Sequence, residues 1–312
     1  MKKKLIPVLL VFTLLLLLLG GGNVLATTDS TSRALDPVVS TSWLAANKNK
    51  VVILDVRSAD DYKAGHIPNS INIPFDANSA WSTSTDTSLL NLPKDANLFK
   101  SLGSCGLSSS SSVVIVSGVA PAPNPPYPLA DATRVALTLI YAGVKNVAIL
   151  DGGYPKWAAE KRETTTKVPV VASRTYKGKV NKNMFVTREY VEQRIGRAII
   201  IDCRDADVYF GVRIEPFANK AGHIPTAKSL PTPWIWEEDG TYRSMDILDL
   251  MASGVAGEDK DKEIILYCGA GGYASSWWFL LTQQMGYKNV KFYDGSAQDW
   301  VKHNFMIAYL YS

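Results

Sequence analysis

Cysteine and histidine are scarce in this chain of 312 residues, which contains three of each. No group of histidine, cysteine and carboxylate side chains has the spacing of a metal site, so we expect no metal ion. The glycines form neither a Walker motif nor a dinucleotide-binding fingerprint, and no other cofactor is indicated. The formal net charge is only +4, with no run of Lys or Arg beyond the first few residues. A nucleic-acid partner is therefore not expected, whereas a small anionic ligand is mildly favoured.

The N-terminus has the features of a secretion signal. Residues 2–4 are lysines, residues 5–19 form a largely apolar run, and a stretch ending in Ala26 offers a cleavage site. The run is shorter than the roughly 18 residues of a membrane span. We therefore expect a signal peptide over residues 1–26, export to the periplasm or the extracellular space, and no stable membrane insertion after processing. An uncleaved N-terminal anchor is the alternative.

The odd number of cysteines leaves at least one thiol free. Exported proteins usually pair their cysteines in disulfides, and an unpaired thiol outside the cytoplasm is at risk of oxidation. A free thiol that persists there is a candidate functional group. Cys203 ends a predicted strand and is interpreted as a small core residue, and Cys105 is interpreted as a loop residue.

The rest of the chain contains two copies of one pattern. A run rich in β-branched residues ends in Asp-x-Arg at Asp55 and again at Asp202, and Ala-Gly-His-Ile-Pro follows in both copies. Further strand-like and helix-like stretches then alternate in the same order. This alternation predicts α/β domains, each with a largely parallel sheet flanked by helices. We assign residues 35–162 to the first copy, residues 163–182 to a polar linker, and residues 183–312 to the second copy.

The later part of the pattern also repeats. Apolar runs that read as buried strands lie at residues 113–116 and 264–267. Helical stretches follow at residues 130–142 and 274–285, and each copy closes with Asp-Gly and an aromatic residue.

These motifs resemble the rhodanese family, whose domain carries an early Asp-x-Arg, a Gly-His-Ile-Pro segment and a late Leu-Asp-Gly-Gly followed by an aromatic residue. The first copy has all three motifs, and the second has the first two with a weakened third. Two such domains in tandem resemble the thiosulfate and 3-mercaptopyruvate sulfurtransferases. The resemblance implies that only the second domain is catalytic and that Cys268 is its nucleophile.

The surroundings of Cys268 suit this chemistry. The residue directly follows a predicted strand and opens a short loop before a helix. The glycines of the loop allow backbone N–H groups to converge on one centre, and the N-terminus of the helix adds partial positive charge, so a thiolate is favoured. We expect Cys268 to take a sulfane sulfur as a persulfide and pass it to a thiol or cyanide-like acceptor. A buried structural cysteine is the alternative. The expected loop consists of Gly269, Ala270, Gly271, Gly272 and Tyr273.

The first copy lacks this nucleophile. Ser117 takes the place of Cys268, and five prolines follow between residues 119 and 128, so no compact loop of N–H groups can form there. We expect the first copy to be non-catalytic and to form one wall of the site. Asp202 and Arg204 are expected to be structural residues near the site, and the histidines of the two Gly-His-Ile-Pro segments to hold hydrogen-bonded turns.

The loop also departs from the family pattern. It contains no basic residue, which makes it more similar to the mercaptopyruvate enzymes than to the thiosulfate enzymes. Tyr273 stands where those enzymes have Thr, and Val208 stands where tandem enzymes have a substrate-binding Arg. Arg213, five positions after Val208, is the candidate cation for an anionic donor.

Two other functions are alternatives to sulfur transfer. A phosphatase of related fold would need Cys-x5-Arg, but Ala274 occupies the position of that Arg, and bidentate binding of a phosphate is lost. A carrier that holds sulfur or another chalcogen on Cys268 without turnover is the second alternative. The sequence does not separate a carrier from a catalyst.

Overall fold

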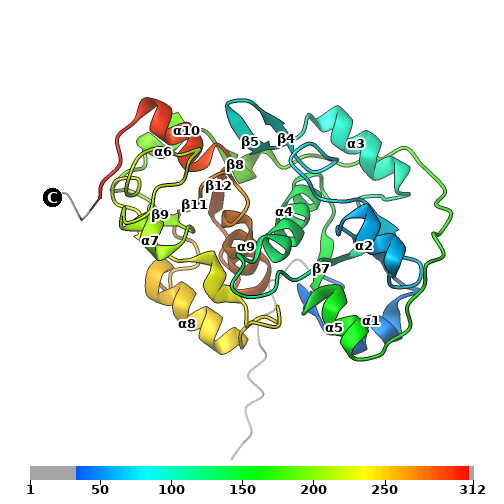
Figure 1. Cartoon of the computed structure of the whole chain (residues 1–312). Coiled ribbons are helices and arrows are strands. Elements are labelled where there is room, and N and C mark those ends of the chain that lie inside the picture. The colour runs from blue at the N-terminus through cyan, green and yellow to red at the C-terminus, as the bar shows by residue number, and fades with distance from the viewer. Residues whose placement is uncertain (1–32, 309–312) are drawn as a thin grey trace, which may run out of the picture. The chain divides into compact units, whose positions relative to one another are not determined.

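The duplicated sequence pattern folds into two five-stranded parallel sheets with equivalent strand order (Figure 1). The computed structural model describes residues 33–308, and the signal segment expected at residues 1–26 lies outside this range. The first sheet has the order β1-β7-β6-β2-β3, formed by Val38–Val39, Asn146–Leu150, Ser112–Val116, Val52–Asp55 and Ile71–Asn72. The second has the order β8-β12-β11-β9-β10, formed by Phe185–Val186, Val290–Tyr293, Ile264–Tyr267, Ile199–Asp202 and Lys228–Ser229.

Helices connect the strands of both sheets. In the first copy they are α1 (Thr41–Asn47), α2 (Ala59–Ala64), α3 (Asp95–Ser104), α4 (Tyr127–Tyr141) and α5 (Gly153–Ala159). In the second they are α6 (Arg188–Glu192), α7 (Ala206–Tyr209), α8 (Met245–Ala256), α9 (Ala274–Phe279) and α10 (Ser296–His303), with short 3₁₀ helices at Lys182–Met184 and Thr232–Ile235. The first copy also contains an antiparallel hairpin of β4 (Thr83–Thr85) and β5 (Ser88–Asn91).

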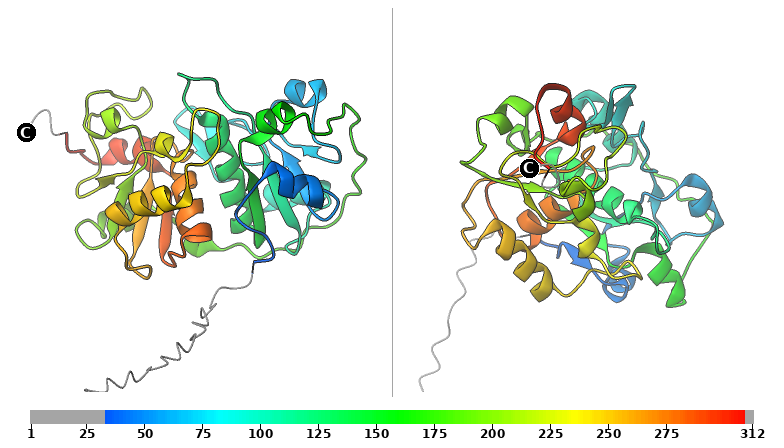
Figure 2. Two further views of the ribbon diagram at one scale, coloured as in Figure 1. Left: turned by 90° about the horizontal axis from the view of Figure 1, so that it is seen from below. Right: turned by 60° about the vertical axis from the view of Figure 1, so that its left-hand side comes forward.

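The two copies share one hydrophobic core. Along β11, Ile264 and Leu266 face this shared core, whereas Ile265 and Tyr267 face a separate core on the other side of the sheet. This alternation follows from the two-residue period of a strand. Helices α4 and α9 lie side by side between the two sheets (Figure 2). The first copy is therefore packed directly against the helix that follows the Cys268 loop.

Two helices differ from the sequence-based expectation. Helix α4 begins at Tyr127, not at Ala130, because Pro128 lies in its first turn, where a missing N–H leaves no bond unmade. Helix α9 ends at Phe279, and the chain continues as a π-helix over Leu280–Gln284 where a single helix to Met285 was expected.

The repeated Asp-x-Arg motif makes the same contacts in both copies. Arg57 pairs with Asp55 at 2.6 Å and donates to the Gly65 carbonyl at 2.9 Å. Arg204 pairs with Asp202 at 2.6 Å and donates to the Gly222 carbonyl at 2.7 Å. The motif therefore fastens the Gly-His-Ile-Pro segment to the end of the strand.

The histidines of these segments hold buried turns, as expected. The ring of His66 stacks on Tyr62 with centroids 3.7 Å apart, and its Nδ1 lies 2.8 Å from the Tyr62 carbonyl oxygen. His223 stacks in the same way on Tyr209 at 3.9 Å. Among the described residues, no helix is long and apolar enough to cross a membrane.

Candidate functional site

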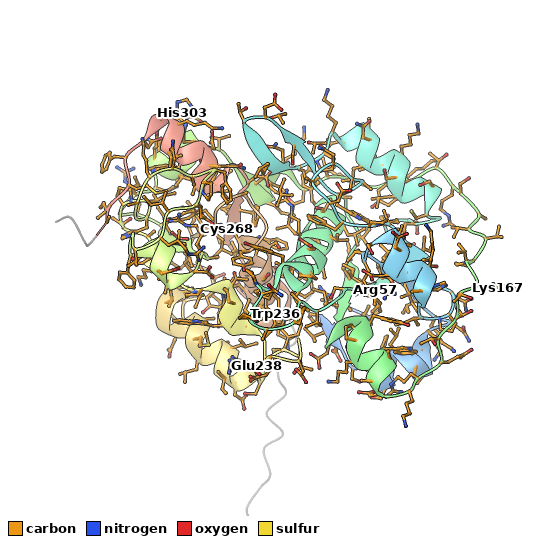
Figure 3. The ribbon with its side chains drawn as sticks, in the orientation of Figure 1. Arg57, Lys167, Trp236, Glu238, Cys268 and His303 are labelled. Atoms are coloured by element: carbon orange, nitrogen blue, oxygen red, sulfur yellow. The ribbon has the colours of Figure 1, made fainter. Side chains whose placement is uncertain are left out.

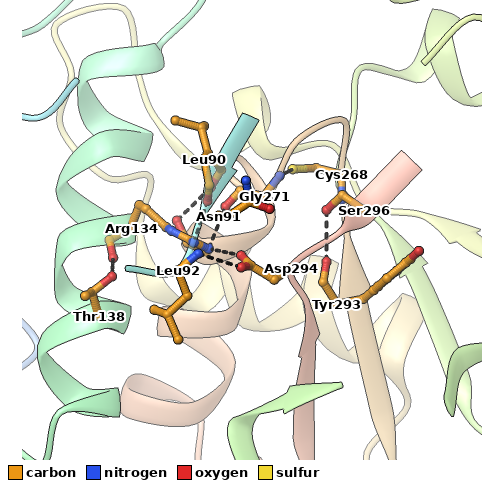
Figure 4. Close-up of polar contacts among 12 residues, drawn as sticks. Leu90, Asn91, Leu92, Arg134, Thr138, Cys268, Gly271, Tyr293, Asp294 and Ser296 are labelled. Atoms are coloured by element: carbon orange, nitrogen blue, oxygen red, sulfur yellow. Dashed lines mark hydrogen bonds and ion pairs between the residues drawn. The ribbon is translucent and has the colours of Figure 1, made fainter. Parts of the chain in front are cut away.

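Cys268 lies at the carboxyl end of β11, in the middle of the second sheet (Figure 3). Only 2% of the residue is exposed. The backbone N–H of Gly271 points at the Cys268 sulfur, with nitrogen and sulfur 3.1 Å apart (Figure 4). A turn of the loop therefore places an N–H donor on the sulfur atom, as a site that holds a thiolate or persulfide requires.

Two glycines of the loop occupy positions where a side chain would be strained or would clash with a neighbour. Gly271 has φ of +87°, where residues with a side chain are strained, and a Cβ at Gly269 would lie 2.6 Å from Oε1 of Glu215. The loop is also tied to the start of α10. The Cys268 carbonyl accepts from the N–H of Ala297 at 2.9 Å, and the Gly269 carbonyl accepts from that of Gln298 at 3.0 Å. The path of the loop is thus fixed from both sides.

Two opposing effects act on the Cys268 thiol. Burial raises its pKa, because a thiolate loses hydration inside the protein. The backbone N–H groups of Ala274, Ala270 and Gly271 lower the pKa, and the negative charge of Glu215 raises it. Burial is the largest of these effects, so the pKa of Cys268 lies above its ordinary value. The N–H groups identified from the sequence are present, but the carboxylate was not foreseen.

Glu215 reaches the site from the loop after α7. Its carboxylate lies against Gly269, and its Oε2 is 3.4 Å from the guanidinium of Arg204. Burial raises the pKa of Glu215, while Arg204 opposes that effect. Nothing in the local sequence marks this residue, because its place depends on the fold of the loop around it.

Arg134 of α4 is the second residue that the sequence did not reveal. Its side chain is fully buried and pairs with Asp294 at 2.7 Å. It also donates to the carbonyls of Gly271 at 3.3 Å and Leu90 at 2.8 Å (Figure 4). The first copy thereby supplies a cation that holds the Cys268 loop, the end of β12 and the β4–β5 hairpin together.

The hairpin makes further contacts with the second copy. The Leu92 N–H donates to Oδ2 of Asp294 at 2.9 Å. The side-chain amide of Gln298 accepts from the Leu89 N–H at 2.8 Å and donates to the Leu89 carbonyl at 2.9 Å. The first copy is therefore part of the support of the loop as well as one wall of the site.

Two tyrosines lie beside the loop. The rings of Tyr273 and Tyr127 are 5.4 Å apart, and Tyr127 is largely exposed. Burial raises the pKa of both tyrosines, the charge of Asp205 adds to that effect, and the charge of Arg213 opposes it. Arg213 is paired with Asp205 and Asp207, the latter at 2.8 Å, and its positive charge is therefore already compensated.

Ser117 stands in the equivalent place of the first copy, directly after β6. It is buried, and in the described part of the chain its hydroxyl has no hydrogen-bond partner. The N–H of Tyr154 donates to its carbonyl, not to its side chain. The contact between a backbone N–H and the side chain that is seen at Cys268 is thus not reproduced at Ser117.

The other two cysteines are also buried and free. Cys203 faces the shared core and lies next to Cys268 on the neighbouring strand, where its N–H donates to the Tyr267 carbonyl. Cys105 ends α3 in a turn, close to the expected loop position, but is only 8% exposed. Within the described residues, no group of three or more metal-binding side chains is found.

Comparisons with known proteins identify the family of the two domains. A model of the rhodanese-like domain matches residues 40–160 and 187–303. A putative thiosulfate sulfurtransferase of Saccharopolyspora erythraea is 30% identical over 281 residues, which cover 86% of this chain and 94% of that protein. The sulfur carrier protein TtuD of Thermus thermophilus is 32% identical over 172 residues, covering 51% of this chain and 60% of that protein.

Solved structures show the same fold. An EanB variant with a cysteine persulfide and ergothioneine has a TM-score of 0.71 and 20% identity, covering 87% of this chain and 71% of that chain. An EanB variant with hercynine has a TM-score of 0.73 and 19% identity, covering 87% and 70%. The two matched segments account for most of the described residues. The chain therefore belongs to the rhodanese family, with two rhodanese-like domains in tandem.

Proposed function

We propose that the protein is an exported sulfurtransferase that moves a sulfane sulfur from a donor to a thiophilic acceptor through a persulfide on Cys268. The observation that carries this proposal is the 3.1 Å contact between the Gly271 N–H and the Cys268 sulfur. Family membership supports sulfur transfer in general. Thiosulfate and 3-mercaptopyruvate are the proposed donors, and the lack of a basic residue in the loop favours the second.

The proposed reaction has two steps. With thiosulfate, the Cys268 thiolate attacks the outer sulfur, and the S–S bond breaks with its electron pair leaving on sulfite. With 3-mercaptopyruvate, the thiolate attacks the thiol sulfur, and the C–S bond breaks with its electron pair leaving on carbon as the enolate of pyruvate. The persulfide then loses its outer sulfur to the acceptor, and the electron pair of the S–S bond returns to the Cys268 sulfur. The Gly271 N–H is placed to stabilise negative charge on this sulfur in both steps.

Mass spectrometry tests the first step directly. After exposure to thiosulfate or 3-mercaptopyruvate, the intact protein should gain the mass of one sulfur atom, and cyanide should remove it. A Cys105→Ala variant should gain the same mass. A sulfur atom that appears on another residue, or none with either donor, would contradict the proposal.

A sulfur carrier is the second candidate, because TtuD is a relative over half of the chain. A carrier and a catalyst share the persulfide but differ in turnover. Excess donor and cyanide should yield many equivalents of thiocyanate per protein for a transferase, and about one for a carrier.

Export is proposed from the basic and apolar segments at the N-terminus. The mass of the N-terminal peptide of the protein recovered outside the cytoplasm would test it. A cytoplasmic protein that retains residues 1–26 would contradict it.

Glu215 should control the pH at which Cys268 reacts. Replacing Glu215 by Gln removes a negative charge that disfavours the thiolate, so the pKa of Cys268 should fall. Because the thiolate is the reactive form, alkylation with iodoacetamide should rise with pH, and the rise should begin at lower pH in the variant. The exposed Glu258 offers a control, and Glu258→Gln should keep the native profile. A profile that stays in place or moves to higher pH in Glu215→Gln would refute this role.

A further inference from the structure

A large open cavity adjoins the Cys268 loop. Its volume is about 800 Å³, which is enough for a small organic molecule. Its lining consists of the proline-rich segment that follows Ser117 and of residues 236–241 with Arg243 and Asp205. Tyr273 of the Cys268 loop also lines the cavity, so the cavity borders the loop that carries the nucleophile. Figure 3 labels Trp236 and Glu238 on this side of the second copy.

The wall contributed by the second copy is acidic. The cavity is lined by four carboxylates, those of Asp205, Glu237, Glu238 and Asp239. Among the described residues that line it, Arg243 is the one with a positive charge. The guanidinium of Arg243 already has partners, because it pairs with Glu237 at 3.2 Å and donates to the Trp234 carbonyl at 3.0 Å. The acidic charge is thus only partly compensated from within the wall.

Glu238 and Asp239 carry the uncompensated charge. Neither has an ion-pair partner within 4.0 Å among residues 33–308. The Asp239 carboxylate accepts from the N–H and the hydroxyl of Thr241, at 3.0 and 2.6 Å, which lowers its pKa and keeps it ionised. The charge of Lys156 also lowers the pKa of Asp239, but Lys156 is itself paired with Asp151 at 3.1 Å.

Aromatic side chains complete the wall. Trp236 and Tyr273 both line the cavity; Trp236 is only 4% exposed and packs against Tyr242 with ring centroids 5.8 Å apart, whereas Tyr273 is half-buried. Aromatic faces attract cations, and carboxylates add to that attraction. Among the described residues that line the cavity, the arginine is already paired, so an anion there would face these carboxylates without a free cation.

We propose that the acceptor of the Cys268 sulfur is a cationic thiol whose positive group occupies this acidic and aromatic cavity. The inference rests on the sulfur transfer proposed above and adds the chemical class of the acceptor. The acceptor thiolate attacks the outer sulfur of the persulfide, the S–S bond breaks, and its electron pair returns to Cys268. The acceptor leaves as a persulfide and Cys268 as a thiolate, and no oxidant or reductant is required because the transferred sulfur keeps its oxidation state.

Three small thiols of similar size provide the test. Protein carrying the Cys268 persulfide is mixed with 2-aminoethanethiol, 2-mercaptoethanol or 3-mercaptopropionate, which carry a positive, no and a negative charge away from sulfur. The rate of persulfide loss is measured by mass spectrometry and corrected for the thiolate fraction of each thiol. We expect the cation to react about tenfold faster than the anion, with the neutral thiol between them. The ratio should shrink as salt is added.

A matched pair of variants isolates the cavity. Glu238→Gln combined with Asp239→Asn removes the unpaired charge and should bring the three rates together. Glu258 and Asp259 form an equivalent exposed Glu-Asp sequence, in which Asp259 also accepts from a backbone N–H two residues later, at 3.0 Å. They do not line the cavity, so Glu258→Gln with Asp259→Asn should preserve the native order of rates.

The outcomes are distinguishable. A persulfide that passes its sulfur to all three thiols at equal rates, or fastest to the anion, overturns the inference and leaves the transferase intact. A preference for the cation that survives Glu238→Gln with Asp239→Asn also overturns it. Failure of Cys268 to acquire sulfur from any donor overturns the proposed function itself.

Discussion

Replacing Cys268 by serine should lower the rate of sulfur transfer by at least about 10³-fold while leaving the fold intact. Serine is the closest replacement in shape, but its oxygen cannot hold a sulfane sulfur as a persulfide that thiols readily open. Thiocyanate formation from thiosulfate or 3-mercaptopyruvate and cyanide measures the loss, and urea unfolding measures the fold.

The other cysteines provide the controls for this result. Cys105→Ala should retain activity, since Cys105 lies at the end of α3 in the first copy. Cys203→Ala should also retain most of the activity, although it removes a side chain next to Cys268 on the neighbouring strand. Transfer at the native rate by Cys268→Ser would show that the sulfur travels by another route.

Arg134→Met should destabilise the protein by about 3–5 kcal/mol, because it leaves the Asp294 carboxylate partly buried without its partner. The carbonyls of Gly271 and Leu90 also lose their donor. The midpoint of urea unfolding should fall accordingly. Transfer activity should fall below what the remaining folded fraction accounts for, since the Cys268 loop loses one of its supports.

Several variants separate these effects. Arg134→Met with Asp294→Asn should recover part of the stability, because no unpaired charge remains. Arg134→Lys keeps the charge and should fall between the native protein and Arg134→Met. The exposed pair of Lys63 and Asp60 offers a contrast, and Lys63→Met should cost less than about 1 kcal/mol. If Arg134→Met unfolds at the same urea concentration as the native protein, the anchoring role is wrong.

The sequence was most informative where the chemistry is local. The Asp-x-Arg repeats, the β-branched runs and the glycines after Cys268 lie within a few residues of the groups that they affect. Strand period and turn chemistry therefore predicted two parallel sheets and a loop with N–H groups on the nucleophile. The limits of the signal peptide, the linker and the two copies stay predictions.

The sequence did not predict the contacts between residues that only the fold brings together. Arg134 lies in a stretch that reads as an apolar helix, and its partner Asp294 belongs to the other copy. Glu215 lies in an irregular loop, and only its path around Arg204 brings it to Gly269. The acidic cavity likewise combines segments from both copies, so its charge could not be read from the net charge of the chain. The mild preference for an anionic ligand inferred from that net charge does not describe this wall.

The contacts of Arg134, Leu89 and Leu92 with the second copy bear on how such a duplicated protein changes over evolution. A change in the β4–β5 hairpin or in α4 of the first copy would alter the surroundings of the Cys268 sulfur, because these elements hold the loop around Cys268. Selection that acts on the Cys268 site therefore extends to the first copy. A repeat exchanged with that of another tandem protein would have to bring both sides of this contact.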